Sequence, residues 1–454
     1  MTVIDDLPAG SSPSELLNPP ASAGLDDLKH GRPVNYRYES NQALPIWPLL
    51  AMIVGYPIWF LAGLGGFMWV AFSIPMAVFL IRRRTVVAPK GIGWWALFLL
   101  AVLGSAISVD TAGRAMGYVL RLGYYLGATA FLLYLLNATK LISAGRIVRA
   151  FTMLWFATVA GGYLALVLGD FTFASPMAYL LPRSLATNDL ISALVNPGFA
   201  DVQDFIGFPV PRPKAPFPFT NSWGSMMGLL TPFGIMALSV PDVGIPRRYV
   251  RITLIASVVP IVISLNRGLW LSLVVAALYV AVRLGIAGHA ALLAKLGLGV
   301  AVLVAVVVFS PLGDLFSSRI DNGHSDADRT ELAVSAVEGA IERPIFGWGT
   351  PRPNVRNLPP IGTHGQVWMV LFSHGFVGGL GWFGAFGTFL WRTRRQHSVG
   401  GLWAHTVLLV ALVQMPVYLL IPHSLFTVMG ALAVALRLSN EPSRPIPIPS
   451  HLSP

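Results

Sequence analysis

Residues 268–286 read GLWLSLVVAALYVAVRLGI, an apolar run that contains a single charged side chain, Arg283. A helix needs about 20 apolar residues to cross the hydrocarbon core of a bilayer, so this stretch predicts a membrane-spanning helix. The whole chain of 454 residues has the same character, with 55% hydrophobic residues, 11% charged residues and a mean hydropathy of +0.67. Soluble domains carry roughly 25% charged residues. The sequence therefore predicts an all-α polytopic membrane protein, because lipid offers no hydrogen-bond partner to an open backbone.

Apolar segments of similar length recur along the chain and predict about 12 transmembrane helices. The expected spans are residues 45–62, 64–81, 91–109, 116–136, 150–168, 222–239, 252–266, 268–286, 291–310, 364–390, 402–420 and 423–437. Together they predict a transmembrane domain over residues 43–438, with two long connections at 169–221 and 311–363. Residues 1–42 and 439–454 are expected to be cytoplasmic tails, and the polar composition of the first predicts disorder.

Basic residues predict the orientation, because the cytoplasmic loops of membrane proteins are enriched in Lys and Arg. With the N-terminus inside and an even number of spans, the basic clusters at residues 82–90, 140–149, 247–251 and 392–395 all fall in cytoplasmic loops. Both termini are then cytoplasmic, and both long connections face the outside of the cytoplasmic membrane. Arginines that remain in those connections against the usual bias indicate an anionic ligand on the outer face.

Composition and residue types exclude several other functions. The chain has no cysteine, which rules out disulfides, thiolate metal sites and a thiol nucleophile. The net charge of +11 is typical of inside-positive loops, and basic tracts interleaved with aromatic residues are absent, so nucleic-acid binding is not expected. His324, Asp326 and Asp328 are candidate ligands for Mg²⁺ or Mn²⁺. A polar turn before a helix explains these residues better, so neither a metal nor another cofactor is expected.

Two arginines are candidates for anion binding. Arg267 lies between two apolar spans, where Gly268 would allow a tight turn. It is either a phosphate clamp, because a planar guanidinium matches phosphate oxygens, or a side chain that snorkels to lipid headgroups. Arg329 lies between Asp328 and Glu331, whose spacing predicts a helix start, and Pro344 should end that helix. In the first turn Arg329 would favour an anion, although a solvated charge at a helix start explains it as well.

His364 begins an expected span, with Gly375 and Gly378 returning to the same helix face below it. A histidine can accept a proton at neutral pH, and the glycines would let another helix pack closely. Helix capping and ordinary glycine packing are the alternative.

Further basic residues lie outside these two groups. Arg212 and Lys214 follow prolines that predict a stiff, extended chain leading to the next span. They would bind either the same anion or lipid phosphates, and Arg183 is a weaker candidate in the same connection. Arg114 and Arg121 share one face of a helix and are expected to face an interior cavity.

Three segments together resemble the O-antigen ligase and polymerase superfamily of bacterial membrane glycosyltransferases. Residues 264–270, SLNRGLW, resemble its Ser-x-Ser-Arg-Gly hairpin, and residues 329–349 resemble its arginine, helix and Pro-x-x-Gly-x-Gly segment. The segment from His364 to Gly378 resembles its His…Gly-x-x-Gly motif, with Gly365 where the family has an amide or hydroxyl residue. Phe217 to Ser222 resembles the Gly-x-Phe-x-Pro-Asn approach to the preceding span. The resemblance covers residues 205–390.

This resemblance implies a GT-C-like helical fold and a metal-independent, inverting transfer. The donor would be a glycan on an undecaprenyl-type or other polyprenyl pyrophosphate, and the acceptor a hydroxyl of lipid, wall or glycan on the extracytoplasmic face. Arg267 and Arg329 would bind the pyrophosphate, with Arg212, Lys214 and Arg183 as further binding residues. Their charge would stabilise the leaving group, while His364 would act as the general base.

Other functions remain open at this point. The chain could be a ligase that attaches a finished glycan, or a polymerase that joins lipid-linked repeat units. A flippase that moves the lipid-linked sugar without breaking it is a different class, and a peptidoglycan polymerase is a weaker option.

Overall fold

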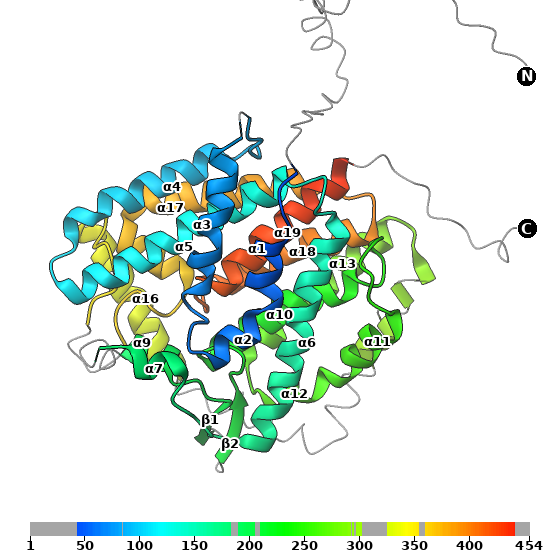
Figure 1. Ribbon diagram of the computed structural model, residues 1–454, viewed down its shortest axis with the longest axis horizontal. Helices are drawn as coiled ribbons and strands as arrows, with labels where there is room; N and C mark the ends of the chain where they lie inside the picture. The colour runs from blue at the N-terminus through cyan, green and yellow to red at the C-terminus, as the bar shows by residue number, and fades with distance from the viewer. Residues whose placement is uncertain are drawn as a thin grey trace, which may run out of the picture. The chain divides into compact units, whose positions relative to one another are not determined.

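The structure is a computed structural model, mostly helical, that describes residues 43–83, 85–182, 189–204, 209–291, 293–294, 297–301, 325–353 and 359–440 (Figure 1). The expected N-terminal tail, residues 1–42, lies outside the described residues. Of the expected C-terminal tail only residues 439 and 440 are described, and they belong to the last helix.

Helices occupy the first five predicted spans. They are α1 (Trp47–Leu49), the π-helix η1 (Leu50–Val54), α2 (Tyr56–Leu61), α3 (Met68–Ile81), α4 (Ile92–Gly104), the 3₁₀ helix η2 (Ser105–Ser108), α5 (Ala112–Asn137) and α6 (Ala144–Leu168). Short polar side chains determine where two of them begin: Thr111 Oγ1 accepts a hydrogen bond from Arg114 N at the start of α5, and Ser143 Oγ accepts one from Arg146 N at the start of α6. Such caps satisfy backbone N–H groups that the helix itself leaves free.

The connection that follows α6 contains α7 (Pro176–Leu180), α9 (Asp189–Val195) and two strands, β1 (Ala200–Asp204) and β2 (Pro209–Pro213). The strands pair antiparallel, with Ala200 opposite Pro213 and Asp204 opposite Pro209. The predicted extended chain at the prolines is thus confirmed. The all-helical expectation missed the sheet, because each strand is only five residues long and three of the five residues of β2 are prolines, which are disfavoured inside strands.

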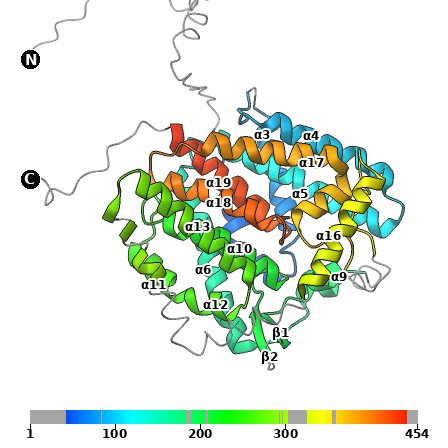
Figure 2. The ribbon, with the colours of Figure 1, turned by 180° about the vertical axis from the view of Figure 1, so that it is seen from behind.

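The C-terminal half contains α10 (Thr220–Met236), α11 (Arg247–Ala256), α12 (Val258–Ile263), α13 (Arg267–Ile286), α16 (Ser325–Glu342), α17 (Gln366–Thr393), α18 (Val399–Gln414) and α19 (His423–Asn440). α10 packs against α6, α13, α18 and α19 (Figure 2). The predicted span 252–266 is two helices, α11 and α12. The predicted span 402–420 ends at Gln414, because Pro416 has no N–H to continue the helix and disfavours a helical Met415.

Four of the described helices are long and apolar enough to cross a membrane: α5, α6, α13 and α17. Four shorter apolar helices accompany them, at Met68–Ile81, Ile92–Ser108, Val399–Gln414 and His423–Ser439. Only residues 291, 293–294 and 297–301 of the predicted span 291–310 are described, and they are helical. The chain is thus a multipass membrane protein, while the twelve spans and the GT-C-like arrangement stay predictions.

Arginines near the predicted cytoplasmic loops bond to the ends of neighbouring helices. Arg83 Nη1 donates to the carbonyl of Asn137 over 2.8 Å, and Arg283 Nη1 donates to the carbonyl of Arg394 over 2.9 Å. Arg437 donates to the carbonyl of Ile142. These bonds join parts of the chain that the positive-inside rule assigns to the same side, and the side of the membrane that they face stays a prediction.

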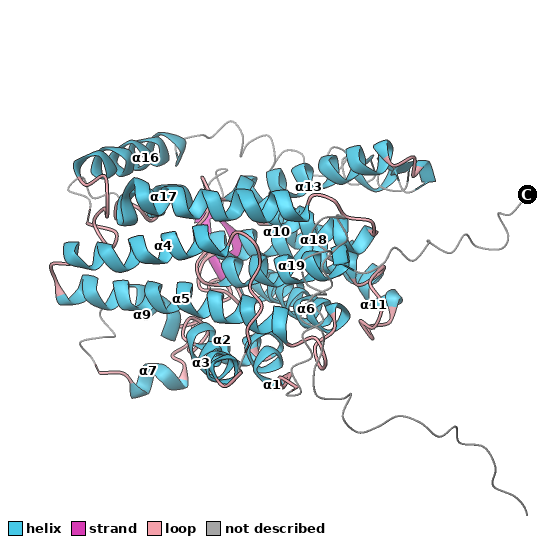
Figure 3. Cartoon of the chain, turned by 90° about the horizontal axis from the view of Figure 1, so that it is seen from above, coloured by secondary structure: helices cyan, strands magenta, loops and turns pink. Residues whose placement is uncertain are grey.

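The helices α4 and α17 make the most extensive helix pair, and α16 packs on the other side of α17 (Figure 3). Phe98 of α4 packs edge-on against Trp382 of α17, with the ring centroids 4.9 Å apart. Gly381 permits this approach, because a β-carbon there would lie 2.5 Å from the backbone nitrogen of Phe98. Small residues at such contacts let two membrane helices come close together.

Replacing Gly381 by Ala should destabilise the protein by about 1–3 kcal/mol, because the new methyl group overpacks the contact between α4 and α17. Thermal unfolding of the purified protein in detergent measures this as a lower transition temperature. Gly387→Ala in the same helix is the matched control, since nothing lies within 4 Å of its β-carbon position. Equal unfolding temperatures for the two variants would contradict this packing.

Candidate functional site

One cavity brings together two of the predicted site residues. Arg329 and His364 both line a cavity of about 520 Å³. Its other lining residues are Thr330, Ala333, Val334, Val337 and Glu338 of α16, Trp368 of α17, and Pro416 and Val417 of the loop after α18. The walls are largely apolar, with the charged groups at Arg329 and Glu338. An apolar cavity with a few converging polar groups is typical of a ligand site.

His364 lies just outside the helix that it was predicted to begin. The next residue, Gly365, has φ +126°, and a β-carbon there would lie 2.4 Å from the carbonyl oxygen of Pro416. Only glycine fits this conformation and this space, which gives a physical reason for the departure from the family motif at Gly365. Gln366 N then donates to the carbonyl of Tyr418 over 2.9 Å, which fixes the start of α17 against the loop after α18.

The hydrogen bonds of Thr363 define the tautomer of His364. Thr363 Oγ1 donates to the carbonyl of Pro360 over 2.6 Å and lies 3.0 Å from His364 Nδ1. Because the hydroxyl proton is already used, the hydroxyl can only accept, so His364 carries its proton on Nδ1. This leaves the lone pair on Nε2, the atom that would take a proton from a substrate.

The charge state of His364 also suits a base. Burial lowers the pKa of the His364 imidazole below its ordinary value, and the positive charge of Arg329 lowers it further. A lowered pKa favours the neutral imidazole, the form that can accept a proton. The two side chains line the same cavity.

Arg329 lies in the second turn of α16, which begins at Ser325. The prediction of a first-turn position was wrong, because the helix starts before the Asp328–Glu331 pair that was taken as the capping signal. The predicted end before Pro344 is confirmed, since α16 ends at Glu342.

Tyr418 connects the cavity to the hairpin that carries Arg267. It is 3% exposed, and its hydroxyl donates to Asn266 Oδ1, the atom that also caps α13 by accepting from Leu269 N. Burial raises the pKa of the Tyr418 hydroxyl, while the positive charges of Arg329 and Arg212 oppose the shift. A buried phenol near two guanidinium groups therefore lies at the centre of the predicted cationic site.

The turn before Arg267 does not use Gly268, although the sequence predicted that it would. Leu265 adopts φ +49°, and Gly268 lies inside the first turn of α13. The glycine is needed for packing, because a β-carbon at Gly268 would lie 2.4 Å from the hydroxyl oxygen of Tyr418. Arg267 is the first residue of α13, directly after the cap, and is half-buried.

Arg212 reaches the same hairpin from β2. Its side chain is buried, with Nε donating to the carbonyl of Ser264 over 3.0 Å and Nη1 donating to Gln203 Oε1 over 2.6 Å. The structure thus brings Arg212 next to the segment that leads into Arg267, although the two are 55 residues apart in the sequence. These two hydrogen bonds hold the guanidinium of Arg212 at the hairpin that leads into Arg267.

Lys214 and Arg183 are the other two residues predicted to bind the anion, and of these the structure describes Lys214. Lys214 Nζ forms an ion pair with Asp201 of β1 at 2.7 Å, which compensates its charge, and Lys214 does not line the cavity. Arg183 lies outside the described residues.

The three candidate metal ligands are described only in part. His324 lies outside the described residues, and Asp326 and Asp328 belong to α16, where their side chains are not described. Among the described residues no group of three His, Cys, Asp or Glu side chains could hold a metal ion.

The predicted glycine stripe of α17 is interrupted. Gly375 has φ +64° and breaks the helical conformation, and Phe376 N donates to the carbonyl of Pro344 over 2.7 Å instead. Gly375 therefore accommodates the loop after α16 rather than another helix. At Gly378 a β-carbon would lie 2.5 Å from the β-carbon of His374, one turn earlier in α17, and 3.7 Å from that of Ala101 in α4, so the crowding there comes from His374.

Sequence reasoning missed Tyr418, Thr363 and Glu338. Tyr418 was placed inside a span, although Pro416 and Pro422 bracket it and are a signal for a loop. Thr363 has no sequence signal of its own, because its role depends on its hydrogen bonds to Pro360 and His364. Glu338 is exposed on the cavity side of α16.

The fold and the cavity define a helical membrane protein with a partly buried cationic site. Residues 252–383 match the family described as O-Antigen ligase, and this segment contains Arg267, Arg329 and His364. The predicted resemblance to the O-antigen ligase superfamily is thereby confirmed over this segment, and it suggests a membrane glycosyltransferase of the ligase or polymerase type. No curated protein and no solved structure matches the chain.

The pKa of His364 should lie below 6.5, and Arg329→Gln should raise it, because the substitution removes a positive charge that disfavours the imidazolium. Arg329→Lys keeps the charge and should leave the pKa low. Titration of isotope-labelled histidine by NMR, with His364→Gln to assign the signal, measures this shift. A His364 signal that titrates above 6.5, or that ignores the charge at position 329, would contradict the arrangement.

Proposed function

We propose that the protein transfers a glycan from a polyprenyl-pyrophosphate carrier to an acceptor hydroxyl on the extracytoplasmic face of the cytoplasmic membrane. The observation that carries this proposal is the shared cavity of Arg329 and His364. An imidazole and a guanidinium therefore border the same space.

The reaction follows from these two groups. His364 Nε2 would take the proton of the acceptor hydroxyl as its oxygen attacks the anomeric carbon. The bond from that carbon to the pyrophosphate oxygen would break at the same time, and attack from the opposite face inverts the configuration. The products are the glycosylated acceptor and the free lipid pyrophosphate, which finally receives the proton.

The leaving group would be stabilised by arginines without a metal ion. A pyrophosphate gains negative charge as it departs, and guanidinium groups donate paired hydrogen bonds to phosphate oxygens. Arg329 would contact it in the cavity, while Arg267 and Arg212 would extend the positive site through the hairpin next to Tyr418. Lys214 is a weaker candidate, because Asp201 already compensates its charge.

His364→Gln should lower transfer by about 100-fold or more, the usual contribution of general base catalysis. Arg329→Gln should lower it by about 100- to 1,000-fold, because a preorganised donor to the leaving group is lost. The measurement is the release of lipid pyrophosphate from a labelled polyprenyl-pyrophosphate glycan in proteoliposomes. Arg248→Gln, on α11 and away from the cavity, is the control and should keep the wild-type rate.

The same assay separates the alternatives. A single product size indicates a ligase, and a ladder of sizes indicates a polymerase of repeat units. Translocation of the lipid-linked glycan with no release of pyrophosphate would contradict glycosyl transfer and indicate a flippase. Wild-type rates in both site variants would contradict the assigned roles.

The proposed outward orientation can be tested directly, because the chain has no cysteine of its own. Cysteine placed at Glu342, at the end of α16, should react with a membrane-impermeant maleimide added outside intact cells. Cysteine placed at Lys140, in the loop between α5 and α6, should react only after the membrane is opened. The reverse pattern would invert the topology and contradict transfer on the outer face.

A further inference from the structure

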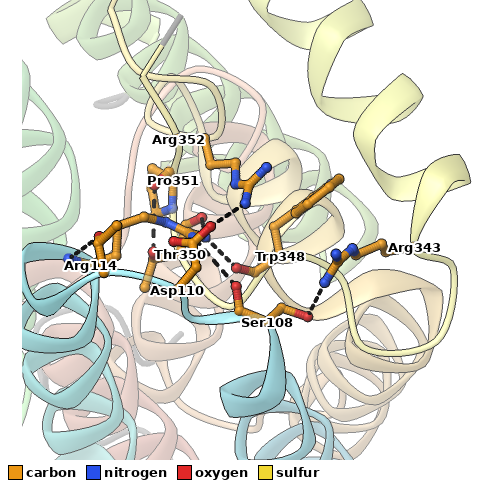
Figure 4. Close-up of polar contacts among 9 residues, drawn as sticks. Ser108, Asp110, Arg114, Arg343, Trp348, Thr350, Pro351 and Arg352 are labelled. Carbon is orange, nitrogen blue, oxygen red and sulfur yellow. Dashed lines mark hydrogen bonds and ion pairs between the residues drawn. The ribbon is translucent and has the colours of Figure 1, made fainter.

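The indole of Trp348 is stacked between two guanidinium groups (Figure 4). The guanidinium carbons of Arg343 and Arg352 each lie 4.0 Å from the centroid of the same ring. Figure 4 shows them on either side of the indole. Arg343 follows α16 and Arg352 lies in the loop after it, and neither lines the cavity that holds His364.

The loop that carries this stack is held firmly in place. Trp348 Nε1 donates to the carbonyl of Gly339 over 2.9 Å, and Trp348 N donates to the carbonyl of Phe372 over 2.9 Å. From α5, Arg114 Nη2 donates to the carbonyl of Trp348 over 2.5 Å and to that of Thr350 over 3.3 Å. Arg114 thus binds this loop and does not line the cavity that holds His364, so its predicted place at an interior cavity stays a prediction. The two stacked guanidinium groups are therefore positioned before any ligand arrives, which reduces the entropy cost of binding.

Positive charge exceeds negative charge in this cluster. Asp110 forms ion pairs with both Arg114 and Arg352, and its hydrogen bond with Arg114 is the main reason that the pKa of its carboxyl lies below the ordinary value. Arg343 forms no ion pair within the described part of the chain; its Nη1 donates to the neutral Ser108 Oγ over 2.8 Å. Glu342 is exposed beside it and makes no ion pair with these arginines among the described contacts. The cluster thus contains three guanidinium groups and a single carboxylate, that of Asp110, which is paired with two of them.

Exposed apolar side chains border the arginines. Ile341 is 63% exposed and Ile345 58% exposed on the α16 side, and Ile107, next to Ser108, is 80% exposed. Phe346 packs over Gly104 of α4 and is still 37% exposed. In a membrane protein such side chains face lipid chains, so the guanidinium groups lie where the apolar surface meets the polar one. A phospholipid has the same order of groups, a phosphate above acyl chains.

We propose that Arg343 and Arg352 bind the phosphate of an anionic phospholipid headgroup, while Ile107, Ile341 and Ile345 contact its acyl chains. Guanidinium groups match phosphate oxygens geometrically, and the net positive charge favours an anionic lipid over a zwitterionic one. A free phosphate has the same headgroup chemistry but would leave the apolar border unused. The site is separate from the His364 cavity, so this proposal does not rest on glycosyl transfer.

Native mass spectrometry of the purified full chain in detergent tests the proposal, with added phosphatidylglycerol or phosphatidylcholine of the same acyl chains. Wild-type protein should retain phosphatidylglycerol preferentially. A basic side chain at a membrane surface contributes about a factor of five to anionic-lipid binding, so Arg343→Gln with Arg352→Gln should weaken retention roughly 25-fold. The single variant Arg343→Gln should weaken it about fivefold, and it removes no ion pair among the described residues.

The matched control removes two other arginines that stack on aromatic rings. Arg248 lies 4.8 Å from the ring centroid of Tyr249, and Arg394 lies 3.4 Å from that of Trp391. Arg248→Gln with Arg394→Gln should leave phosphatidylglycerol retention unchanged.

Three results would overturn the proposal. They are equal retention of the two lipids by the wild type, an equal loss in the control variant, and displacement of the lipid by millimolar inorganic phosphate. The last result would identify the source of the ligand as free phosphate instead of a membrane lipid. The readout here is lipid retention, whereas the readout for glycosyl transfer is the release of lipid pyrophosphate. Either proposal can therefore fail while the other stands.

Discussion

Two hydrogen bonds hold the side chain of Arg212 against the hairpin that leads into Arg267. Its Nε donates to the carbonyl of Ser264, and its Nη1 donates to Gln203 Oε1. Lys214, two residues further along the chain, forms an ion pair with Asp201. The side chain of Arg212 is buried, so its position depends on these contacts, because burying a charged group is costly unless the group is hydrogen-bonded.

The same region depends on a loop that turns back between two helices. Pro416 ends α18 early, and the residues after it carry Tyr418 against Asn266 and support the start of α17 through the carbonyls of Pro416 and Tyr418. The hairpin before α13, the loop before α17 and the loop after α18 are therefore mutually bonded. A change in one of them should move the others, because they share hydrogen bonds and leave little free space. This coupling explains why glycine is required at both 268 and 365, where the backbone approaches a neighbouring oxygen.

Cationic side chains on α16 and in the loop after it lie at two different surfaces. Arg329 lines an open, largely apolar cavity beside His364, which suits a ligand with both apolar and charged parts. Arg343 and Arg352 are arranged around Trp348 beside exposed isoleucines, which suits a ligand that stays in the membrane. The bridge between Arg352 and Ile361 connects the second surface to the loop that carries His364. An anion bound at Arg352 would thus lie on the same short segment of chain as the proposed base.

The sequence by itself determined the membrane class, the helical character and the family resemblance, because each depends on composition, apolar length or local motifs that need no partner. It also indicated Arg329 and His364 as candidates, since their motifs lie within short, continuous segments. Only the tertiary structure decided that Tyr418 lies among the arginines, that Arg212 holds the hairpin before Arg267, and that Lys214 is compensated by Asp201. These relations join residues far apart in the chain, and apolar periodicity cannot report them. The tautomer of His364 and the break at Gly375 belong to the same group, because a hydrogen bond or a close backbone contact sets each of them.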